Sequence, residues 1–544
     1  MKYDRRLGLA VITASLAAIV VCWPCLRGGV LSNMDDDVYL EKAREAGGIT
    51  ARGLRWAFTE VEPYYQPLVR GSHLLVYTIS GTNPVGHHAV NLGLHVLNTL
   101  LVVLLAYQLL PGGVAWLAGV LFAVHPLQAE SVAWISGRTQ LLCGAFMLGA
   151  ALAYLKAEQS GQRKWLWLVA TFYMLGWLCK PIVATLPLVL LVLDWFPLRR
   201  HVGLSWWRLL REKLWMFAVT ALMAPLTYVF AQRSGMAVDT GELGWLERVL
   251  VAGRAVVFYL WKFVWPAWLS PFYPLPGEVR AGNPDFWVPI PLLVIFGIAI
   301  WRWRQRLPAL AAAWFVYLAL LLPVLGLTQF GYQSAANRHM YLAMIPLVLL
   351  VVGGAGRFWE RLAGGGRVGL AVLTLGGVFA LGIRCHAAVS MWRDDETLWR
   401  NVLHWYPDYG VANLKVAHAA VAKRDFVTAR RCAERAAVAW PDNVEVQGLL
   451  GLVCLKDGDA PAAIRVLLPL AERTDVWLPL ARYNLASAYV RVGSNAAAVV
   501  ELGKVMAREP QFREIARRDR ELVALRSDER FLQLLQTTSG EEEP

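Results

Sequence analysis

The sequence predicts an all-α protein in two parts: a polytopic bundle of about eleven membrane-spanning helices, followed by a solenoid of paired helices. The chain of 544 residues is 57% hydrophobic and only 17% charged, with a mean hydropathy of +0.43. Its apolar residues come in repeated blocks of membrane length rather than on amphipathic stripes. After residue 400 these blocks give way to soluble helical sequence with a period of about 34 residues.

The apolar blocks define a membrane part over residues 1–390. Taking about 17 to 25 apolar residues per crossing, we predict spans at 7–26, 86–109, 112–126, 138–156, 165–179, 182–196, 214–231, 286–304, 309–327, 340–354 and 368–386. The first block is too long for the core of a cleaved signal peptide and ends in Cys22-Trp23-Pro24-Cys25, not in small residues. We therefore interpret it as a retained span.

The net charge of +13 follows from membrane topology. Much of the basic excess falls in short loops between apolar blocks, which indicates cytoplasmic loops rather than a nucleic-acid surface. This rule places the N-terminus in the cytoplasm and the repeats outside it.

Two outer loops, 27–85 and 232–285, are too long for simple turns. In the second, residues 248–268 form either a span, which would move the repeats to the other side, or an interfacial helix, which Arg254 and Lys262 favour.

The second part follows a connector at residues 391–409. Small residues, aromatic residues and prolines recur at spacings that predict three tetratricopeptide repeats over 410–510. The matching positions are Ala429, Ala436 and Pro441; Leu450, Gly451, Gly458 and Ala463; and Asn484, Leu485, Ala486, Tyr489, Ala498 and Pro510. Three units meet the usual minimum for a stable array, because each buries its apolar face against the next. Residues 511–544 then predict a polar capping helix and an acidic tail.

Three consecutive acids, Asp35, Asp36 and Asp37, stand directly after the first span. Placing carboxylates beside the hydrocarbon of a membrane costs free energy, so a cluster at this position needs a structural or functional explanation. One interpretation is a cap and first-turn charge for an amphipathic helix over residues 39–46. Three adjacent carboxylates exceed what a cap needs, and their repulsion favours a basic partner, a cation or a raised pKa. Asp35 or Asp36 is therefore a candidate general base toward a hydroxyl, and Asp37 a candidate cap.

Basic and polar side chains gather at the same predicted outer ends of the spans. The candidate donor or phosphate ligands are His125, Glu130, Arg138, Lys180, Arg338 and Tyr341, with His339 beside Arg338. A guanidinium such as that of Arg138 binds phosphate oxygens in pairs. The alternative is that Glu130 caps a helix while the cations snorkel to the membrane interface. Three cations on one face with an acidic run favour a phosphate site.

Other chemistries find less support. His73, His87, His88 and His95 accompany asparagines, which indicates polar contacts inside a helix bundle, and no cysteine or carboxylate completes a metal site with them. A divalent metal is therefore not indicated, its requirement stays open, and no cofactor is assigned. The sequence contains no Walker-type loop, no GxSxG motif and no dinucleotide fingerprint in a βαβ setting, which argues against ATP-driven or serine-nucleophile chemistry.

The ordered motifs also support a comparison with a known family. They are Asp35-Asp36, Tyr65-Gln66-Pro67-Leu68, His88-Ala89-Val90-Asn91 with His95, His125-Pro126 with Glu130 and Gly137-Arg138, Asn337-Arg338 with Tyr341, and Trp392-Arg393-Asp394. This series, followed by repeats, resembles the transmembrane and tetratricopeptide-repeat O-mannosyltransferases and their bacterial relatives, within the GT-C class of polytopic glycosyltransferases. The resemblance implies a GT-C fold, a polyprenyl-phosphate-linked sugar as donor, and transfer on the outer side. It maps the catalytic acid onto Asp35 or Asp36 and phosphate ligands onto Arg138 and Arg338.

We therefore predict a membrane glycosyltransferase that moves a sugar, with inversion, from a polyprenyl-phosphate carrier to an acceptor hydroxyl. The acceptor is a protein Ser or Thr, held by the repeats, or a glycan; membrane lipids are the other partners. The absence of Asn-x-Ser/Thr sequons favours a bacterial inner membrane. Two alternatives stay open: a non-enzymatic membrane-anchored repeat scaffold, and a transporter of lipid-linked saccharides, which would need ionisable groups deep inside the spans.

Overall fold

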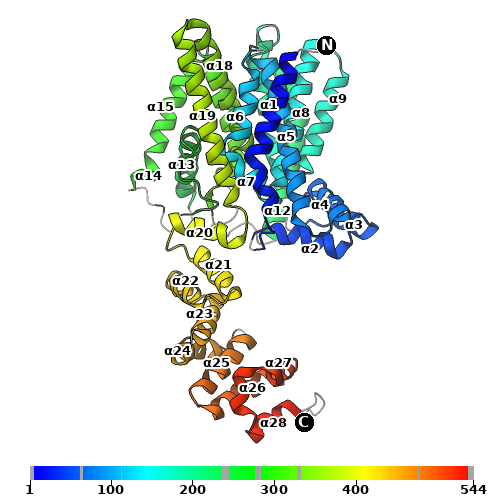
Figure 1. Ribbon diagram of the computed structural model, residues 1–544. Helices are drawn as coiled ribbons and strands as arrows, with labels where there is room; N and C mark the ends of the chain where they lie inside the picture. The colour runs from blue at the N-terminus through cyan, green and yellow to red at the C-terminus, as the bar shows by residue number, and fades with distance from the viewer. Residues whose placement is uncertain are drawn as a thin grey trace. The chain divides into compact units, whose positions relative to one another are not determined.

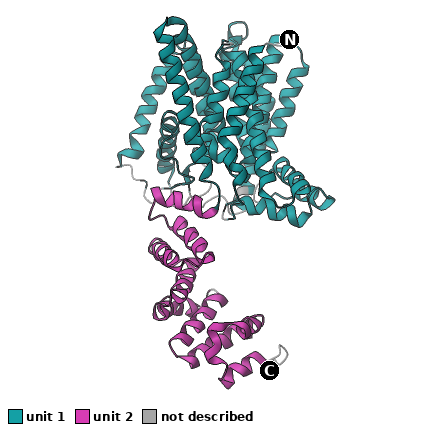
Figure 2. Ribbon diagram, in the orientation of Figure 1, with its two compact units in different colours: residues 1–394 teal, residues 395–544 magenta. Residues whose placement is uncertain are grey.

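The computed structural model describes residues 5–32, 34–61, 65–111, 113–233, 244–275, 279, 283–326, 333–473, 475 and 477–536. The chain divides into two compact units, Met1–Asp394 and Asp395–Pro544, coloured teal and magenta in Figure 2. Among the described residues the strands are limited to one antiparallel pair, β1 (Tyr273–Pro274) and β2 (Gln333–Ala335). The predicted all-α class is therefore confirmed.

Unit 1 is a bundle of apolar helices that lie side by side (Figure 1). Its main helices are α1 (Arg5–Cys22), α5 (Pro84–Leu109), α6 (Ala115–Val124), α8 (Arg138–Ser160), α9 (Lys164–Trp177), α10 (Leu186–Trp195), α12 (Leu214–Arg233), α13 (Trp245–Val264), α15 (Pro289–Trp303), α16 (Pro308–Leu321), α18 (Ile345–Arg361) and α19 (Gly365–Ser390). Small residues bring these helices close together. A Cβ added at Gly119 of α6 would lie 2.2 Å from Val103 of α5 and 3.1 Å from Ala14 of α1. Any larger residue at position 119 would therefore clash with α5 and α1.

Every predicted span coincides with an apolar helix, but the helices differ in length. Five are long and apolar enough to cross a bilayer: Arg5–Arg27, Pro84–Leu109, Ile135–Ser160, Pro284–Trp303 and Gly365–Ser390. A sixth is formed if Asn337–Ala343 and Ile345–Arg361, which meet at a 55° bend, act as one span. These helices make the protein a multi-pass membrane protein. Four of the other predicted spans correspond to the shorter apolar segments Ala115–Val124, Pro181–Trp195, Leu214–Phe230 and Pro308–Val324, and the fifth to α9, so the count of eleven stays a prediction.

The predicted span at 112–126 is the clearest case of a shorter element. Helix α6 stops at Val124, and ten residues rise only about 15 Å, half of a hydrocarbon core. The chain then makes three short turns before α8: η2 (Pro126–Gln128), α7 (Ala129–Ala133) and η3 (Ile135–Gly137). Pro126 ends the helix because its ring is incompatible with a continued α-helix. All residues from His125 to Gly137 are buried, so this broken segment lies inside the bundle.

Short elements surround the end of the bundle that follows α1. Figure 1 shows three helices there, α2 (Asp36–Ala46), α3 (Ala51–Thr59) and α4 (Pro67–Ser80). The remaining short elements are η4 (Pro181–Thr185), η7 (Leu322–Val324), η8 (Asn337–His339) and α17 (Met340–Ala343). Trp392, from the last predicted motif, stacks on Trp134 with ring centroids 5.9 Å apart. The segment after α19 is thereby fastened to the segment between α6 and α8.

Two local predictions need correction. The helix expected over residues 39–46 begins at Asp36, so Asp37 lies in its first turn, and Asp35 takes the N-cap position that we assigned to Asp37. Residues placed in the 391–409 connector form a helix, α20 (Asp395–Trp405), within unit 2. The predicted interfacial segment is α13, which is absent from the five long apolar helices, and its interfacial position stays a prediction. Residues 234–243, 276–278 and 280–282 of the 232–285 loop, and the acidic tail Glu541 to Pro544, lie outside the described residues.

Unit 2 repeats one helical hairpin. Its helices are α21 (Gly410–Ala422), α22 (Phe426–Ala439), α23 (Val444–Lys456), α24 (Ala460–Glu472), α25 (Pro479–Arg491) and α26 (Asn495–Arg508). The turn inside each hairpin has a left-handed residue, Arg424, Gly458 or Gly493, with φ of 60°, 94° and 79°. The next residue donates its backbone N–H five positions back at 2.9 Å in all three hairpins. The turns are therefore the same structure at intervals of 34 and 35 residues.

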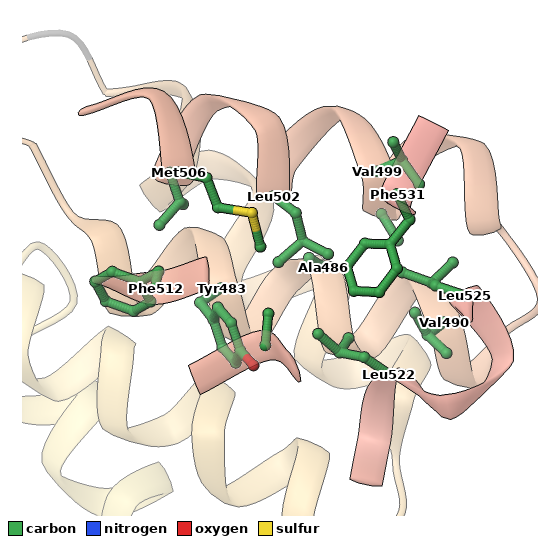
Figure 3. Packing of buried hydrophobic residues seen from close by; sticks show 13 residues of the cluster. Tyr483, Ala486, Val490, Val499, Leu502, Met506, Phe512, Leu522, Leu525 and Phe531 are labelled. Carbon is green, nitrogen blue, oxygen red and sulfur yellow. The ribbon is translucent and has the colours of Figure 1, made fainter. Parts of the chain in front are cut away.

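The third hairpin carries the terminal elements α27 (Phe512–Arg518), η9 (Arg520–Leu525) and α28 (Glu529–Gln536). Figure 3 shows their shared core, in which Phe531 and Leu525 lie against Val490 and Val499 and Phe512 lies near Tyr483. Burying a large apolar side chain contributes roughly 1.5–3 kcal/mol. These side chains cover the apolar face of the third hairpin, and the capping role of this segment stays a prediction.

Candidate active site

A cavity of about 680 Å³ lies at the end of the unit 1 bundle where α2 begins. The polar or aromatic residues that line it are Asp35, Tyr39, Gln66, Trp134, Ser136, Thr139, Lys180, Thr227, Tyr228, Gln333, Ser334, Arg338 and His339. They come from α2 and the residue before it, the residue before α4, the broken segment before α8, the first turn of α8, the residue before η4, α12, β2 and η8. One carboxylate and two cations therefore share a cavity among otherwise uncharged described residues.

Asp35 is the carboxylate on the cavity wall. It stands at the N-cap of α2, but its side chain makes no capping hydrogen bond, so its carboxylate oxygens are not used to cap the helix. Burial raises the pKa of Asp35 above its ordinary value, although the positive charge of Arg338 opposes the shift. A half-buried carboxylate with a raised pKa, open to a cavity, has the properties of a general base.

Asp36 has a different environment. Its carboxylate is fully buried. Oδ1 accepts hydrogen bonds from the backbone N–H of Ser136 at 2.9 Å and from its hydroxyl at 2.6 Å, and Oδ2 accepts from the N–H of Leu31 at 3.1 Å. Burial raises the pKa of Asp36 to about 7, while these hydrogen bonds oppose the shift. Asp36 therefore joins the start of α2 to the turn before α8, and the structure separates two acids that the sequence left equivalent.

Arg338 is held on the cavity wall by Glu130. The Glu130 side chain has no exposed surface, whereas that of Arg338 is 16% exposed. The carboxylate accepts from the Arg338 backbone N–H at 3.0 Å and from Nη1 at 2.5 Å. The guanidinium carbon also lies 5.3 Å from the ring centroid of Trp134. Glu130 does not line the cavity, so it contacts Arg338 rather than a ligand.

Lys180 is the second cation on the wall. Its Nζ donates to Oε1 of Gln140 at 2.6 Å, a neutral partner. Burial lowers the pKa of Lys180 to about 8, and the charge of Arg338 lowers it further in the same direction. Among the described residues, no carboxylate forms an ion pair with this half-buried ammonium, and an anionic ligand would offset the cost of its partial burial.

Arg138, a predicted phosphate ligand, lies elsewhere. It is fully buried and absent from the cavity lining. Its guanidinium donates to Oδ1 of Asn91 at 2.9 Å and to the carbonyl of His87 at 2.8 Å, and Nη1 lies 3.2 Å from Nδ1 of His73. The structure therefore gives Arg138 partners inside the bundle and not on the cavity wall, and its contact with a donor phosphate stays a prediction.

His125 and Tyr341 are also outside the lining. Nε2 of His125 lies 3.0 Å from the carbonyl of Phe263, and its Nδ1 accepts from the N–H of Leu127 at 3.3 Å. The Tyr341 hydroxyl lies 3.0 Å from Nδ1 of His95 and 3.0 Å from Nδ2 of Asn98. Both side chains are buried in unit 1, so they hold segments together rather than face the cavity.

Sequence reasoning missed three supporting residues, Ser136, Gln140 and Tyr39. Ser136 holds Asp36, Gln140 holds Lys180, and the Tyr39 hydroxyl donates to Oε1 of Gln66 at 2.8 Å. Their signal is weak because each is an ordinary polar residue near a span end. Among the described residues, no three histidine, cysteine or acidic side chains are grouped closely enough to hold a metal ion.

A second cavity of about 170 Å³ is almost wholly apolar. It lies between α5, α8, α10, α16 and α18, and its lining includes Leu186, Leu320 and Leu342. Each of these residues is within four positions of a residue that lines the polar cavity: Ala184, Leu322 and His339. Three segments of the chain therefore contribute residues to both cavities.

The fold and the cavity define an all-helical, multi-pass membrane protein with a charged cavity at one end of its bundle. No family model and no solved structure match the chain. Curated relatives do match it in part, and they are protein O-mannosyl-transferases.

Protein O-mannosyl-transferase Tmtc1 of Drosophila melanogaster is 39% identical over 124 residues, which are 22% of this chain and 14% of that protein. Tmtc2 of the same species is 40% identical over 138 residues, 24% of this chain and 15% of the relative. Human TMTC4 is 32% identical over 139 residues, 21% and 19% of the two chains. The match thus spans less than a fifth of each relative. These relatives come from animals and lend no support to the predicted bacterial setting.

Proposed function

We propose that the protein is a membrane glycosyltransferase of the GT-C class, which transfers a sugar from a polyprenyl-phosphate carrier to a hydroxyl of a protein. The observation that carries the proposal is the placement of Asp35, Lys180 and Arg338 around one cavity. A base and two cations are what attack by a hydroxyl and departure of a phosphate require. The names of the partial relatives support the same class of reaction.

The donor is an amphiphile, and the two cavities suit its two ends. Lys180 and Arg338 offer positive charge to a phosphate, with Arg338 already paired to Glu130. The apolar cavity along α10, α16 and α18 offers hydrocarbon contacts to the first part of a prenyl chain. A soluble nucleotide sugar has no hydrocarbon chain that could occupy the second, apolar cavity.

The reaction is a single displacement. Asp35 takes the proton from the acceptor hydroxyl as its oxygen attacks the anomeric carbon. The bond from that carbon to the phosphate oxygen breaks, and the polyprenyl phosphate leaves with the electron pair. Lys180 and Arg338 stabilise the charge that develops on this leaving group, which is usually the largest catalytic term. Attack opposite the leaving group inverts the anomeric configuration.

The test uses purified protein, polyprenyl-phosphate mannose labelled in the sugar, and a Ser/Thr-containing acceptor peptide. Asp35→Asn should lower transfer by about 100 to 10,000-fold, the usual contribution of general base catalysis. Asp37→Asn is the matched control, because it removes the same charge two positions away and should change transfer by less than about threefold. Full activity of Asp35→Asn, or an equal loss in both variants, would contradict the assignment.

We propose that the recurring hairpins of unit 2 are the predicted tetratricopeptide repeats and that they bind the protein acceptor on the extracytoplasmic side. The uniform turns at Arg424, Gly458 and Gly493 support this classification. Hydrogen exchange of the full chain, with and without a mannose-accepting protein, should show protection in α21 to α26. Protection confined to unit 1 would remove the repeats from acceptor binding.

A further inference from the structure

His339 lines the polar cavity next to Arg338, but the displacement described above gives it no role. It is the last residue of η8 and is half-buried. Its Nδ1 lies 3.0 Å from the hydroxyl oxygen of Tyr259, a fully buried residue of α13. Since one ring nitrogen is directed at Tyr259, the polar atom left for the cavity is Nε2.

The Tyr259 hydroxyl decides which nitrogen carries the proton. Its oxygen accepts the backbone N–H of Ala336 at 2.9 Å, which leaves the hydroxyl hydrogen to be donated. Within the described residues, His339 Nδ1 is the acceptor that the structure provides for that hydrogen. Nδ1 therefore accepts, and in the neutral ring the proton resides on Nε2.

We propose that His339 binds the head group of the lipid-linked sugar by donating a hydrogen bond from Nε2 to one of its oxygens, and that Tyr259 is the positioning residue that holds this tautomer. This inference rests on the proposed function. The oxygen belongs either to the phosphate or to a sugar hydroxyl, since both accept hydrogen bonds. With Arg338 and Lys180 nearby, a neutral donor adds a directed contact without a third positive charge.

Two substitutions at His339 distinguish the effect of the Nε2 hydrogen bond from the effect of removing the imidazole ring. His339→Gln places an amide N–H near the position of Nε2, whereas His339→Asn places one near Nδ1, where it faces Tyr259. In the mannose transfer assay, His339→Gln should keep the donor KM within about threefold of wild type. His339→Asn should raise it about tenfold, the effect of one hydrogen bond to a ligand.

The source of the oxygen follows from inhibition by polyprenyl phosphate without sugar. If His339 binds the phosphate, the inhibition constant and the donor KM should both rise in His339→Asn. If it binds a sugar hydroxyl, only the donor KM should rise. Both results support the proposal. An unchanged KM in His339→Asn, or equal impairment of His339→Gln and His339→Asn, would overturn it.

Tyr259→Phe provides a second test, which distinguishes control of the His339 tautomer from a role of Tyr259 in packing alone. It should raise the donor KM in the wild-type background but not in the His339→Gln background, because an amide needs no tautomer control. Equal effects in both backgrounds would show that Tyr259 only packs. Absence of turnover in the wild-type protein would contradict the proposed function itself, whereas an active wild type with unaffected His339 variants would contradict this inference alone.

Discussion

Glu130 and Arg338 lie 208 positions apart in the chain, and the carboxylate of the first accepts hydrogen bonds from both the backbone and the guanidinium of the second. The contact fastens η8 to α7, the middle of the broken segment between α6 and α8. It also sets the direction in which one of the two cavity cations points. Loss of this pair should therefore change both stability and donor binding.

Replacing Glu130 with Gln should destabilise the protein by roughly 1–3 kcal/mol, because a buried hydrogen-bonded charge loses its partner. Arg338→Gln alone should cost a similar amount. The double variant should be less destabilised than the sum of the two by about 1–3 kcal/mol, as is found for residues in direct contact. Denaturation of the four proteins in detergent measures the coupling, and strict additivity would contradict the pairing.

Asp36→Asn should destabilise unit 1 by roughly 1–3 kcal/mol, because the substitution removes an acceptor from buried hydrogen-bond donors. The amide nitrogen must face one of the N–H or O–H donors of Ser136 or Leu31, so at least one hydrogen bond is lost. Thermal unfolding measures the loss. Asp35→Asn is the matched control, because it should lower activity without a similar fall in stability; the reverse pattern would exchange the roles of the two acids.

The pH dependence of transfer should be bell-shaped. Asp35 must be deprotonated to act as a base, and its raised pKa places the acid limb above the ordinary range of an aspartate. Lys180 must be protonated to bind phosphate, so kcat/KM should fall as pH rises through about 8. Lys180→Arg should remove this alkaline limb, since an arginine stays protonated to above pH 12. An alkaline limb that persists unchanged in Lys180→Arg belongs to another group.

Arg138→Lys tests whether Arg138 holds the bundle together or binds the donor. A lysine cannot serve Asn91, the His87 carbonyl and His73 together, so we expect a loss of roughly 2–4 kcal/mol in stability. The donor KM of the protein that remains folded should be unchanged. A raised KM with normal stability would instead support the phosphate role that the family resemblance implies.

The repeat turns offer a prediction for unit 2. Arg424 adopts the left-handed conformation that costs a non-glycine residue about 1 kcal/mol, whereas Gly458 adopts it freely. Arg424→Gly should therefore stabilise unit 2 by up to about 1 kcal/mol, and Gly458→Ala should destabilise it by about as much. Denaturant unfolding followed by far-UV circular dichroism measures both, and changes of the same sign would show that the turns are not equivalent.

The sequence predicted the helices better than the site. Apolar block length and the period near 34 residues are local properties, and each predicted span and hairpin coincides with helices of the structure. The predicted span at 112–126 ends within two residues of α6, but the sequence did not show that the connection to the next span folds into short buried turns, because apolar residues give a similar signal in a membrane span and in a buried segment.

By itself, the sequence determined that this protein is helical, membrane-embedded and equipped with acids and cations near the ends of its spans. Only the tertiary structure decided which of them share a cavity. Asp35 and Asp36 are adjacent, yet the packing of α2 on Ser136 buries one and leaves the other on the cavity wall. Arg138 and Lys180 look alike in sequence, but partners distant along the chain enclose the first and leave the second facing the cavity, and such long-range contacts are not encoded in local patterns.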